Sequence, residues 1–460
     1  MIILPSTPPI PRTLPVSQLN SELTSARSSL IIQNCDSFNE SVRYAVNLEH
    51  YLENVFEFIN SESSANDLDE ILRFASKFVL GNVNQVPWTN IKREKKKEDR
   101  GDKAEKAEKG DKSNKLDKLD KKLQLLKVSS DFEWTLLEEI QVIVISISSV
   151  YIKIGSELIN ELVDLESTPE VTEKWKQVVN FYKTSISFSK FGSKINSSVI
   201  HVFLIKIAEI CIQVSILSKS LWVNRNSYDP LKTANNGTLS RVAIYVLNEI
   251  KTAKQLLKEL EITSLTTSPT PASSTSFNYS SWLNTLTIIE KYSTAYSGLF
   301  LSIENYQQDK LGHAIGLVNF SLLNLQSKRI EATNEAKGIN KLKSKFSTKR
   351  NDHLLTSFNS ISTLNLDKSV FNEKSGIIVK DVSYLFDQLI SLHLKYTKEN
   401  NNLKFDEIVN WQDVTNDSKW PLGNKIPVSD ILAYDPLTFS AKDTLAISKL
   451  DEYHGRGAYY

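Results

Sequence analysis

The amino-acid sequence predicts an all-α protein: an elongated, curved (boomerang-like) stack of helical hairpins similar to an α-solenoid, with room for a small β element near the N-terminus. Apolar residues recur at three- and four-residue spacing over long stretches, as they do on one face of a helix. The 460-residue chain holds 14 Gly and 13 Pro, few turn residues for a fold of many short strands. The apolar stretches follow one another in pairs without a fixed repeat length, which favours stacked hairpins over a strict repeat protein.

The first part of the chain predicts an extended segment followed by three helices. Residues 1–17 are rich in proline, and we expect them to lie extended on the surface of the fold. Apolar residues at helical spacing predict helices within 19–30, 42–59 and 68–79. Gly81 then stands where a glycine commonly ends a helix.

Three segments break the apolar pattern and are predicted to be disordered insertions: 91–122, 263–280 and 331–352. The first contains 14 Lys and Arg against 9 Asp and Glu and has no aromatic residue. Such a composition cannot bury enough apolar surface to offset its ordering entropy. A solvated insertion is therefore favoured over a tether to anionic lipid, because acidic residues interleave the lysines. We expect residues 1–440 to form a single domain and 441–460 a flexible tail.

The remaining apolar stretches predict the body of the stack. Its most hydrophobic part, Ile140–Ile154, contains five polar residues and falls short of the roughly 20 apolar residues that a membrane-spanning helix needs. We therefore expect a buried core helix there. Residues 405–439 predict an extended tail with aromatic anchors. Helices are predicted at 132–165, 171–191, 198–222, 239–262, 281–308, 309–329 and 377–398.

Composition narrows the classes of function. Lys plus Arg number 55 and Asp plus Glu 54, so the chain lacks the basic excess of a dedicated nucleic-acid-binding protein. The N-terminus has neither the charged region nor the long apolar region of a secretory signal. Cys35 and Cys211 imply no disulfide framework, and Cys211 is expected to be a buried thiol in an apolar helix. These features predict a soluble cytoplasmic protein.

No pattern of catalytic, cofactor-binding or metal-ligating residues emerges. The six histidines are scattered without metal-ligand spacing, and no paired-cysteine site is present. Phosphate-binding glycine loops and the nucleophile elbow of hydrolases are also absent from the sequence. We therefore predict a protein that is not an enzyme, with no catalytic residues, no cofactor and no metal.

Two glycines inside an apolar helix pattern require a physical reason. Gly312 and Gly316 lie four residues apart, and each glycine within a helix costs about 1 kcal/mol relative to alanine. Together with Ala314 they form a row of small residues, which predicts close approach of a neighbouring helix. A phosphate site is the alternative, but it would need a preceding strand that the pattern lacks.

The same segment carries a resemblance to a known family. Residues 310–325, KLGHAIGLVNFSLLNL, resemble the helix with the pattern G-x-A-I-G-x-L-x-x-A of Bro (ALIX-type) domains. Residues 132–139, FEWTLLEE, resemble that family's FE-x-x-x-x-L-x-N segment. Further similar segments follow in the family's order at 175–188, 207–216 and 222–226.

Within that family the chain is most similar to the fungal palC-type regulators of the pH response. Its ending, at 409–414 and 426–432, resembles their closing segment. The chain departs from the pattern where Asn319 and Ser321 replace alanine and in the Lys-rich insertion.

The resemblance implies a cytoplasmic scaffold that binds the C-terminal amphipathic helix of an ESCRT-III subunit. It also implies a role with other pH-signalling components, ending in proteolytic activation of a zinc-finger transcription factor. Recruitment to the endosomal membrane or the cell cortex would then occur only through partners. The alternative hypothesis is a helical-repeat subunit of a vesicle-trafficking or tethering complex unrelated to pH signalling.

By order along the chain, the helix at 239–250 corresponds to part of the ESCRT-III groove of Bro domains. Leu239, Val242, Tyr245 and Val246 lie at helical spacing and are the predicted protein-binding residues. The competing interpretation is that this face packs on a neighbouring helix, because most apolar stripes are core.

Overall fold

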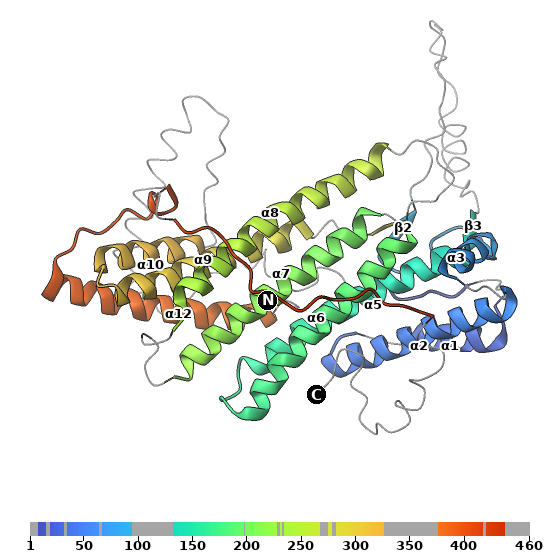
Figure 1. The fold of residues 1–460 in the computed structure, drawn as a ribbon, viewed down its shortest axis with the longest axis horizontal. Helices are drawn as coiled ribbons and strands as arrows, with labels where there is room; N and C mark the ends of the chain where they lie inside the picture. The colour runs from blue at the N-terminus through green and yellow to red at the C-terminus, as the bar shows by residue number, and fades with distance from the viewer. Residues whose placement is uncertain are drawn as a thin grey trace, which may run out of the picture.

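The protein is a row of long helices packed side by side in the order of the chain, as the computed structural model in Figure 1 shows. The all-α prediction is confirmed. The structure describes residues 8–14, 19–31, 35–63, 67–93, 132–196, 198–227, 231, 234–266, 275–277, 282–325, 376–416 and 420–437. The predicted insertion 331–352 and the predicted tail 441–460 lie outside these residues.

The helices begin and end close to where the apolar periodicity predicts them. Their bounds are α1 Ser21–Ile31, α2 Phe38–Ser63, α3 Leu68–Lys77, α5 Leu136–Leu162, α6 Pro169–Ile195, α7 Val199–Arg225, α8 Asn236–Thr266, α9 Trp282–Gln307, α10 Leu311–Leu325 and α12 Gly376–Glu399. A π-helical turn, η4 (Asn400–Lys404), and a short 3₁₀ helix, η5 (Val414–Asn416), follow α12. From α5 to α10 each helix packs chiefly on the next one, as expected for stacked hairpins.

Two small antiparallel sheets join the helices. Strand β1 (Val79–Val83) pairs with β3 (Phe132–Thr135), and β2 (Ile91–Arg93) pairs with β4 (Thr275–Phe277). The predicted insertions 91–122 and 263–280 were therefore drawn too wide. Each contributes a three-residue strand whose backbone groups bond to the other, a long-range pairing that local composition cannot indicate. The second also begins within α8, which runs to Thr266.

Side-chain caps fix where the central helices start. Thr135 and Glu138 form a capping box at the start of α5, in which the Thr135 N–H donates to Glu138 Oε2 (2.8 Å). At the start of α6, Thr168 accepts from the Val171 N–H and Pro169 occupies the first turn. These caps satisfy backbone N–H groups that would otherwise lack partners.

Helix α5 is the centre of the core. It contacts α2, α3, α6, α7 and α12, and its side chains from Ile140 to Ile152 are buried all around the helix. By length and composition alone, α5 and α7 could each cross a membrane, but 89% and 67% of their most apolar windows are buried inside the protein. The prediction of a core helix at Ile140–Ile154 is confirmed. Cys211 and Cys35 are both free and buried.

In the described part of the proline-rich N-terminal segment, Pro8, Pro9 and Pro11 are buried rather than laid on the surface. The Pro9 carbonyl accepts hydrogen bonds from Tyr44 Oη and Ser146 Oγ, both at 2.6 Å. Ile10 exchanges hydrogen bonds with Thr89. The surface position predicted from composition is wrong for residues 8–11, because proline-rich backbone still offers carbonyls that buried hydroxyl groups can satisfy.

One buried carboxylate on α5 joins the N-terminal half of the protein. Glu139 Oε1 accepts from Arg27 Nε (2.7 Å) and Tyr51 Oη (3.2 Å), while Oε2 accepts from the indole N–H groups of Trp88 (2.8 Å) and Trp134 (2.7 Å). Arg27 also donates to the carbonyls of Arg12 and Pro87. Burial alone would lower the pKa of Arg27, but the charge of Glu139 and its hydrogen bond hold it above the ordinary value.

We expect Glu139→Gln to destabilise the protein by about 3–5 kcal/mol, because Arg27 would remain buried without a negative partner. Urea denaturation measures the change. Glu173→Gln is the matched control, since it removes an exposed ion pair with Lys176 and should cost less than about 1 kcal/mol. Equal stability of the two variants would contradict the central role of Glu139.

A buried histidine makes stability depend on pH. The His201 ring lies against Gly192, where a β-carbon would collide with it, and its Nδ1 has no hydrogen-bond partner among the described residues. Burial lowers its pKa from 6.5 to about 4. Between these values the unfolded chain binds a proton that the folded protein does not. Stability is therefore fully present above pH 6.5 and falls as the pH drops toward 4.

The part of this loss that His201 causes should reach on the order of 3 kcal/mol near pH 4, so His201→Gln, which cannot be protonated there, should lose less stability by that amount. Burial also lowers the pKa of His393, and the loss that it causes should remain in the variant. Thermal unfolding of both proteins between pH 7 and 4 tests this. His50→Gln, at an exposed position, should keep the pH dependence of the original chain. If His201→Gln lost stability with the same slope, His201 would not be the responsible group.

Candidate protein-binding site

The C-terminal segment crosses the helical row as an extended chain. We call residues 405–416 and 420–437 the strap. It leaves the end of α12 and passes over α10, α8, α7 and α6, as the dark red trace in Figure 1 shows. The predicted extended tail with aromatic anchors is confirmed for these residues. The described strap residues belong to no β-sheet. They nevertheless connect α10, α8, α7 and α6, which are not all consecutive in the sequence.

A rigid turn aims the strap at α10. Phe405 has a positive φ of 59°, and its N–H donates to the Asn400 carbonyl (2.8 Å). The buried Asn400 side chain then bonds both backbone groups of Asp406, at 2.8 and 3.0 Å. The Asp406 carboxylate caps α10 by accepting from the N–H groups of Leu311 (3.0 Å) and Gly312 (3.3 Å).

The two glycines of α10 are needed for the strap. A β-carbon at Gly312 would collide with the Glu407 carbonyl, and one at Gly316 would lie 2.5 Å from the carbonyl oxygen of Val409. The prediction of a close approach at this row of small residues is correct, but the predicted partner, a helix, is wrong. The backbone carbonyls of Glu407 and Val409 are the strap atoms nearest to these glycines, so the helix is approached by extended backbone rather than by a second helix.

The middle and end of the strap are held by hydrogen bonds and by aromatic packing. The Asn424 N–H donates to the Arg241 carbonyl on α8 (3.0 Å), and Ile426 exchanges two hydrogen bonds of 3.0 Å with the Gln213 side chain on α7. Tyr434 is buried against α6, where it stacks on Phe188 with ring centres 4.6 Å apart. Outward-facing leucines of the strap stay in solvent, among them Leu422 at 88% exposure.

The four predicted protein-binding residues lie beneath or beside this crossing on α8. Leu239, Val242 and Val246 are buried in the core, so the stripe that they form packs on neighbouring helices. Because they are buried, these three side chains do not line an open groove, and the competing interpretation, a face packed on neighbouring helices, describes them. Tyr245 is half-buried, and its backbone lies 2.6 Å from a β-carbon built at Gly423 of the strap. A role of this helix in binding stays a prediction.

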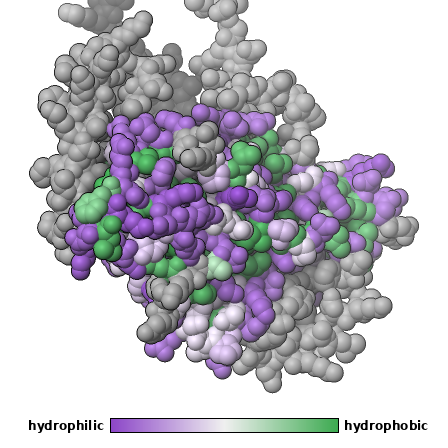
Figure 2. All heavy atoms as spheres, turned by 60° about the vertical axis from the view of Figure 1, so that its left-hand side comes forward, coloured by the Kyte–Doolittle hydropathy of each residue, from purple (hydrophilic) through white to green (hydrophobic). Residues whose placement is uncertain are grey.

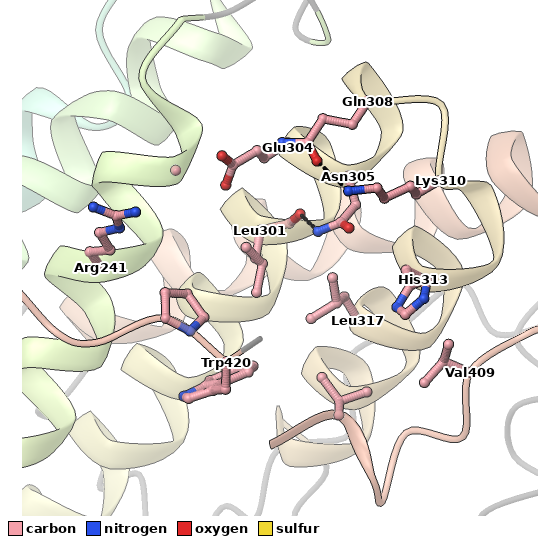
Figure 3. Close-up of a pocket in the computed structure, with 13 residues that line it drawn as sticks. Arg241, Leu301, Glu304, Asn305, Gln308, Lys310, His313, Leu317, Val409 and Trp420 are labelled. Carbon is pink, nitrogen blue, oxygen red and sulfur yellow. Dashed lines mark hydrogen bonds between the residues drawn. The ribbon is translucent and has the colours of Figure 1, made fainter. Parts of the chain in front are cut away.

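A pocket of about 230 Å³ opens where the strap passes between α8, α9 and α10 (Figure 3). Its apolar wall comes from α9, α10 and the strap. Polar and charged side chains surround this wall at the opening. The apolar residues are Leu301, Leu317, Val409, Val414, Trp420 and Pro421, and the polar ones are Arg241, Glu304, Asn305, Gln308, Lys310 and His313.

The pocket is held in shape by contacts around it. Trp420 packs edge-on against Phe320 of α10, with ring centres 5.8 Å apart. The turn between α9 and α10 is closed by the Lys310 N–H, which donates to the Asn305 carbonyl (2.9 Å). Figure 2 turns this end of the molecule forward and shows a mostly hydrophilic surface with separate hydrophobic groups.

The arrangement can bind a ligand but offers no recognised set of catalytic groups. Among the described residues no cluster of three or more His, Cys, Asp or Glu could hold a metal ion. His313 is the single histidine of the pocket wall. A mixture of apolar wall and charged opening is typical of surfaces that bind peptides.

Sequence reasoning placed none of the pocket residues in a site. They come from α8, α9, α10, the turn between α9 and α10, and the strap. These segments are far apart in the sequence, so no local spacing connects their residues. The available signal was the pair Gly312 and Gly316, which marked where the strap crosses α10.

Comparisons with known proteins give one family match and a similar solved structure. A family of unknown function (DUF5355) matches residues 134–460. The chain belongs to this family. No protein with curated annotation matches the chain. A solved Bro1 domain, studied as the structural basis of endosomal targeting, is similar at 14% identity and a TM-score of 0.36, over 81% of this chain and 88% of that one.

We expect Gly316→Ala to displace the strap, because the new β-carbon would lie 2.5 Å from the Val409 carbonyl oxygen, a backbone atom. The overpacking should cost about 1–3 kcal/mol and make the strap more sensitive to limited proteolysis. Asn248→Ala, at an exposed position of α8, is the control and should change neither property. An unchanged melting temperature and cleavage pattern in Gly316→Ala would show that the strap is not seated on this glycine.

Proposed function

We propose that the protein is a non-catalytic adaptor that binds an ESCRT-III subunit through the C-terminal amphipathic helix of that subunit. The Bro-like sequence pattern supports this partner. The observation that carries an adaptor function is the open pocket with an apolar wall and charged opening, built on a firmly packed helical body. A rigid surface of this kind binds a partner segment without a large ordering cost on the adaptor's side.

The face of α8 beside the pocket can extend the contact. Arg241 and Tyr245 lie four residues apart and so share one face of the helix. Tyr245 reaches the surface in part, whereas Val242 and Val246 support it from the core. We therefore keep Tyr245 as the predicted binding residue of this helix. Leu239, Val242 and Val246 would contribute indirectly, by packing in the core and so fixing where Tyr245 lies. An amphipathic helix laid here could use anchors at matching spacing.

The finer proposal is a palC-type role in alkaline-pH signalling, supported by the sequence resemblance. In this role the chain, with residues 1–440 as one domain, is cytoplasmic and binds no nucleic acid. It reaches the endosomal membrane or the cell cortex through its partners. There it supports the proteolytic activation of a zinc-finger transcription factor by other signalling components.

The adaptor function is tested by pulldown of purified chain with the C-terminal helices of the ESCRT-III subunits. We expect one helix or a small subset to bind, and Tyr245→Ala to weaken that binding about tenfold or more without changing the melting temperature. Lys251→Ala, at an exposed position further along α8, is the matched control and should bind as the original chain does.

Failure of every ESCRT-III helix to bind would reject this partner and favour a tethering-complex subunit.

The signalling role has its own readout. Deletion of the gene should abolish cleavage of the zinc-finger factor at alkaline pH while leaving general endosomal sorting intact. Normal cleavage in the deletion strain would refute pH signalling but not adaptor binding.

A further inference from the structure

We infer that the pocket between α8, α9, α10 and the strap takes one large apolar side chain of a partner peptide, flanked in that peptide by carboxylates. The inference rests on the proposed adaptor function for the presence of a partner, and it specifies the chemistry of the bound segment. It follows from three features of the pocket: its size, its apolar wall and its unpaired positive charges.

The size suits a side chain rather than a cofactor. At about 230 Å³ the cavity lies below the roughly 300–1,000 Å³ of typical small-molecule pockets. Leu301 and Trp420 are only partly buried and line the cavity, so they provide apolar surface for the anchor. Burial of one large apolar side chain is worth about 1.5–3 kcal/mol, which is the energy of a typical anchor residue.

Two cations flank the opening without acidic partners. Arg241 lies on the α8 side and Lys310 at the start of α10 (Figure 3). Neither forms an ion pair with any residue that the structure describes. Lys310 donates instead to the neutral Gln308 side chain (2.8 Å), which a stronger acceptor can replace.

Two acids near the opening, Asp309 and Asp406, are engaged elsewhere. Asp309, next to Lys310 in sequence, pairs with Lys404 at 2.5 Å, and Asp406 caps α10. The Glu304 carboxylate lies over Gly237 at the start of α8, where a β-carbon would be 2.5 Å from Oε1. The free N–H groups and dipole of a helix start favour a carboxylate there. Arg241 and Lys310 thus stand against Glu304 as the one acid of the lining, so the charge presented to a ligand is positive on balance and an acidic peptide complements it.

Selection of binders from a phage-displayed library of random 12-residue peptides tests the inference. On the full-length chain we expect enrichment of peptides in which Asp or Glu stands next to Leu, Ile, Met, Phe or Trp. Synthetic copies with amidated C-termini should keep their affinity, since the carboxylates are side chains. Their binding should weaken with added salt.

Charge reversal identifies the site. Arg241→Glu combined with Lys310→Glu should weaken the acidic peptides about tenfold or more and favour copies with Lys in place of each acid. Both positions are exposed, so the variant should melt as the original chain does. Arg43→Glu, on the exposed side of α2, is the matched control and should not change affinity.

Several outcomes would overturn the inference: no binder, binders that are neutral or basic, or acidic peptides that bind the double variant equally well. Loss of affinity on amidation would show that the bound carboxylate is the free C-terminus of the peptide. That result would overturn the inference, which assigns binding to side-chain carboxylates. An ESCRT-III helix whose binding is unchanged in the double variant would leave the adaptor function standing and remove the pocket from it.

Discussion

The Glu139 carboxylate is the interaction on which the N-terminal half of the fold depends. Its two oxygens accept from an arginine, a tyrosine and two tryptophans that come from four different parts of the chain. A buried charge is costly unless it is paired and fully hydrogen-bonded, so these donors must all be in place together. The requirement ties α1, α2, the segment around Trp88 and Trp134 of β3 to one point on α5.

The sequence predicted much of the fold because helices are local. Periodicity placed α9 at 281–308 and α10 at 309–329, against observed bounds of Trp282–Gln307 and Leu311–Leu325. It could not place strands β2 and β4, whose pairing joins Ile91 to Phe277 and Arg93 to Thr275, or the buried position of Pro9. These depend on hydrogen bonds between distant segments, which leave no regular pattern in the residues on either side.

The candidate site was harder to predict for a related reason. The stripe containing Val242 and Val246 has the same appearance in the sequence whether a helix or a partner covers it, and the structure shows that neighbouring helices do. Arg241, directly before Val242, gives no signal in the sequence, because an isolated arginine on a helix is ordinary. Its significance arises only when the turn before α10 brings Lys310 to the same opening and the strap closes the wall.

The strap also changes how such a stack can unfold. A row of hairpins in which each contacts its neighbours can lose its ends one unit at a time, because stability is a sum of local terms. Here a single extended segment is bonded to α10, α8, α7 and α6 in succession. Peeling any one of these helices away breaks contacts that also hold the others. The strap thus couples helices that would otherwise contact only their neighbours. Unfolding of α10 therefore weakens the contacts that hold α6, and the helices from α6 to α10 unfold as one cooperative unit.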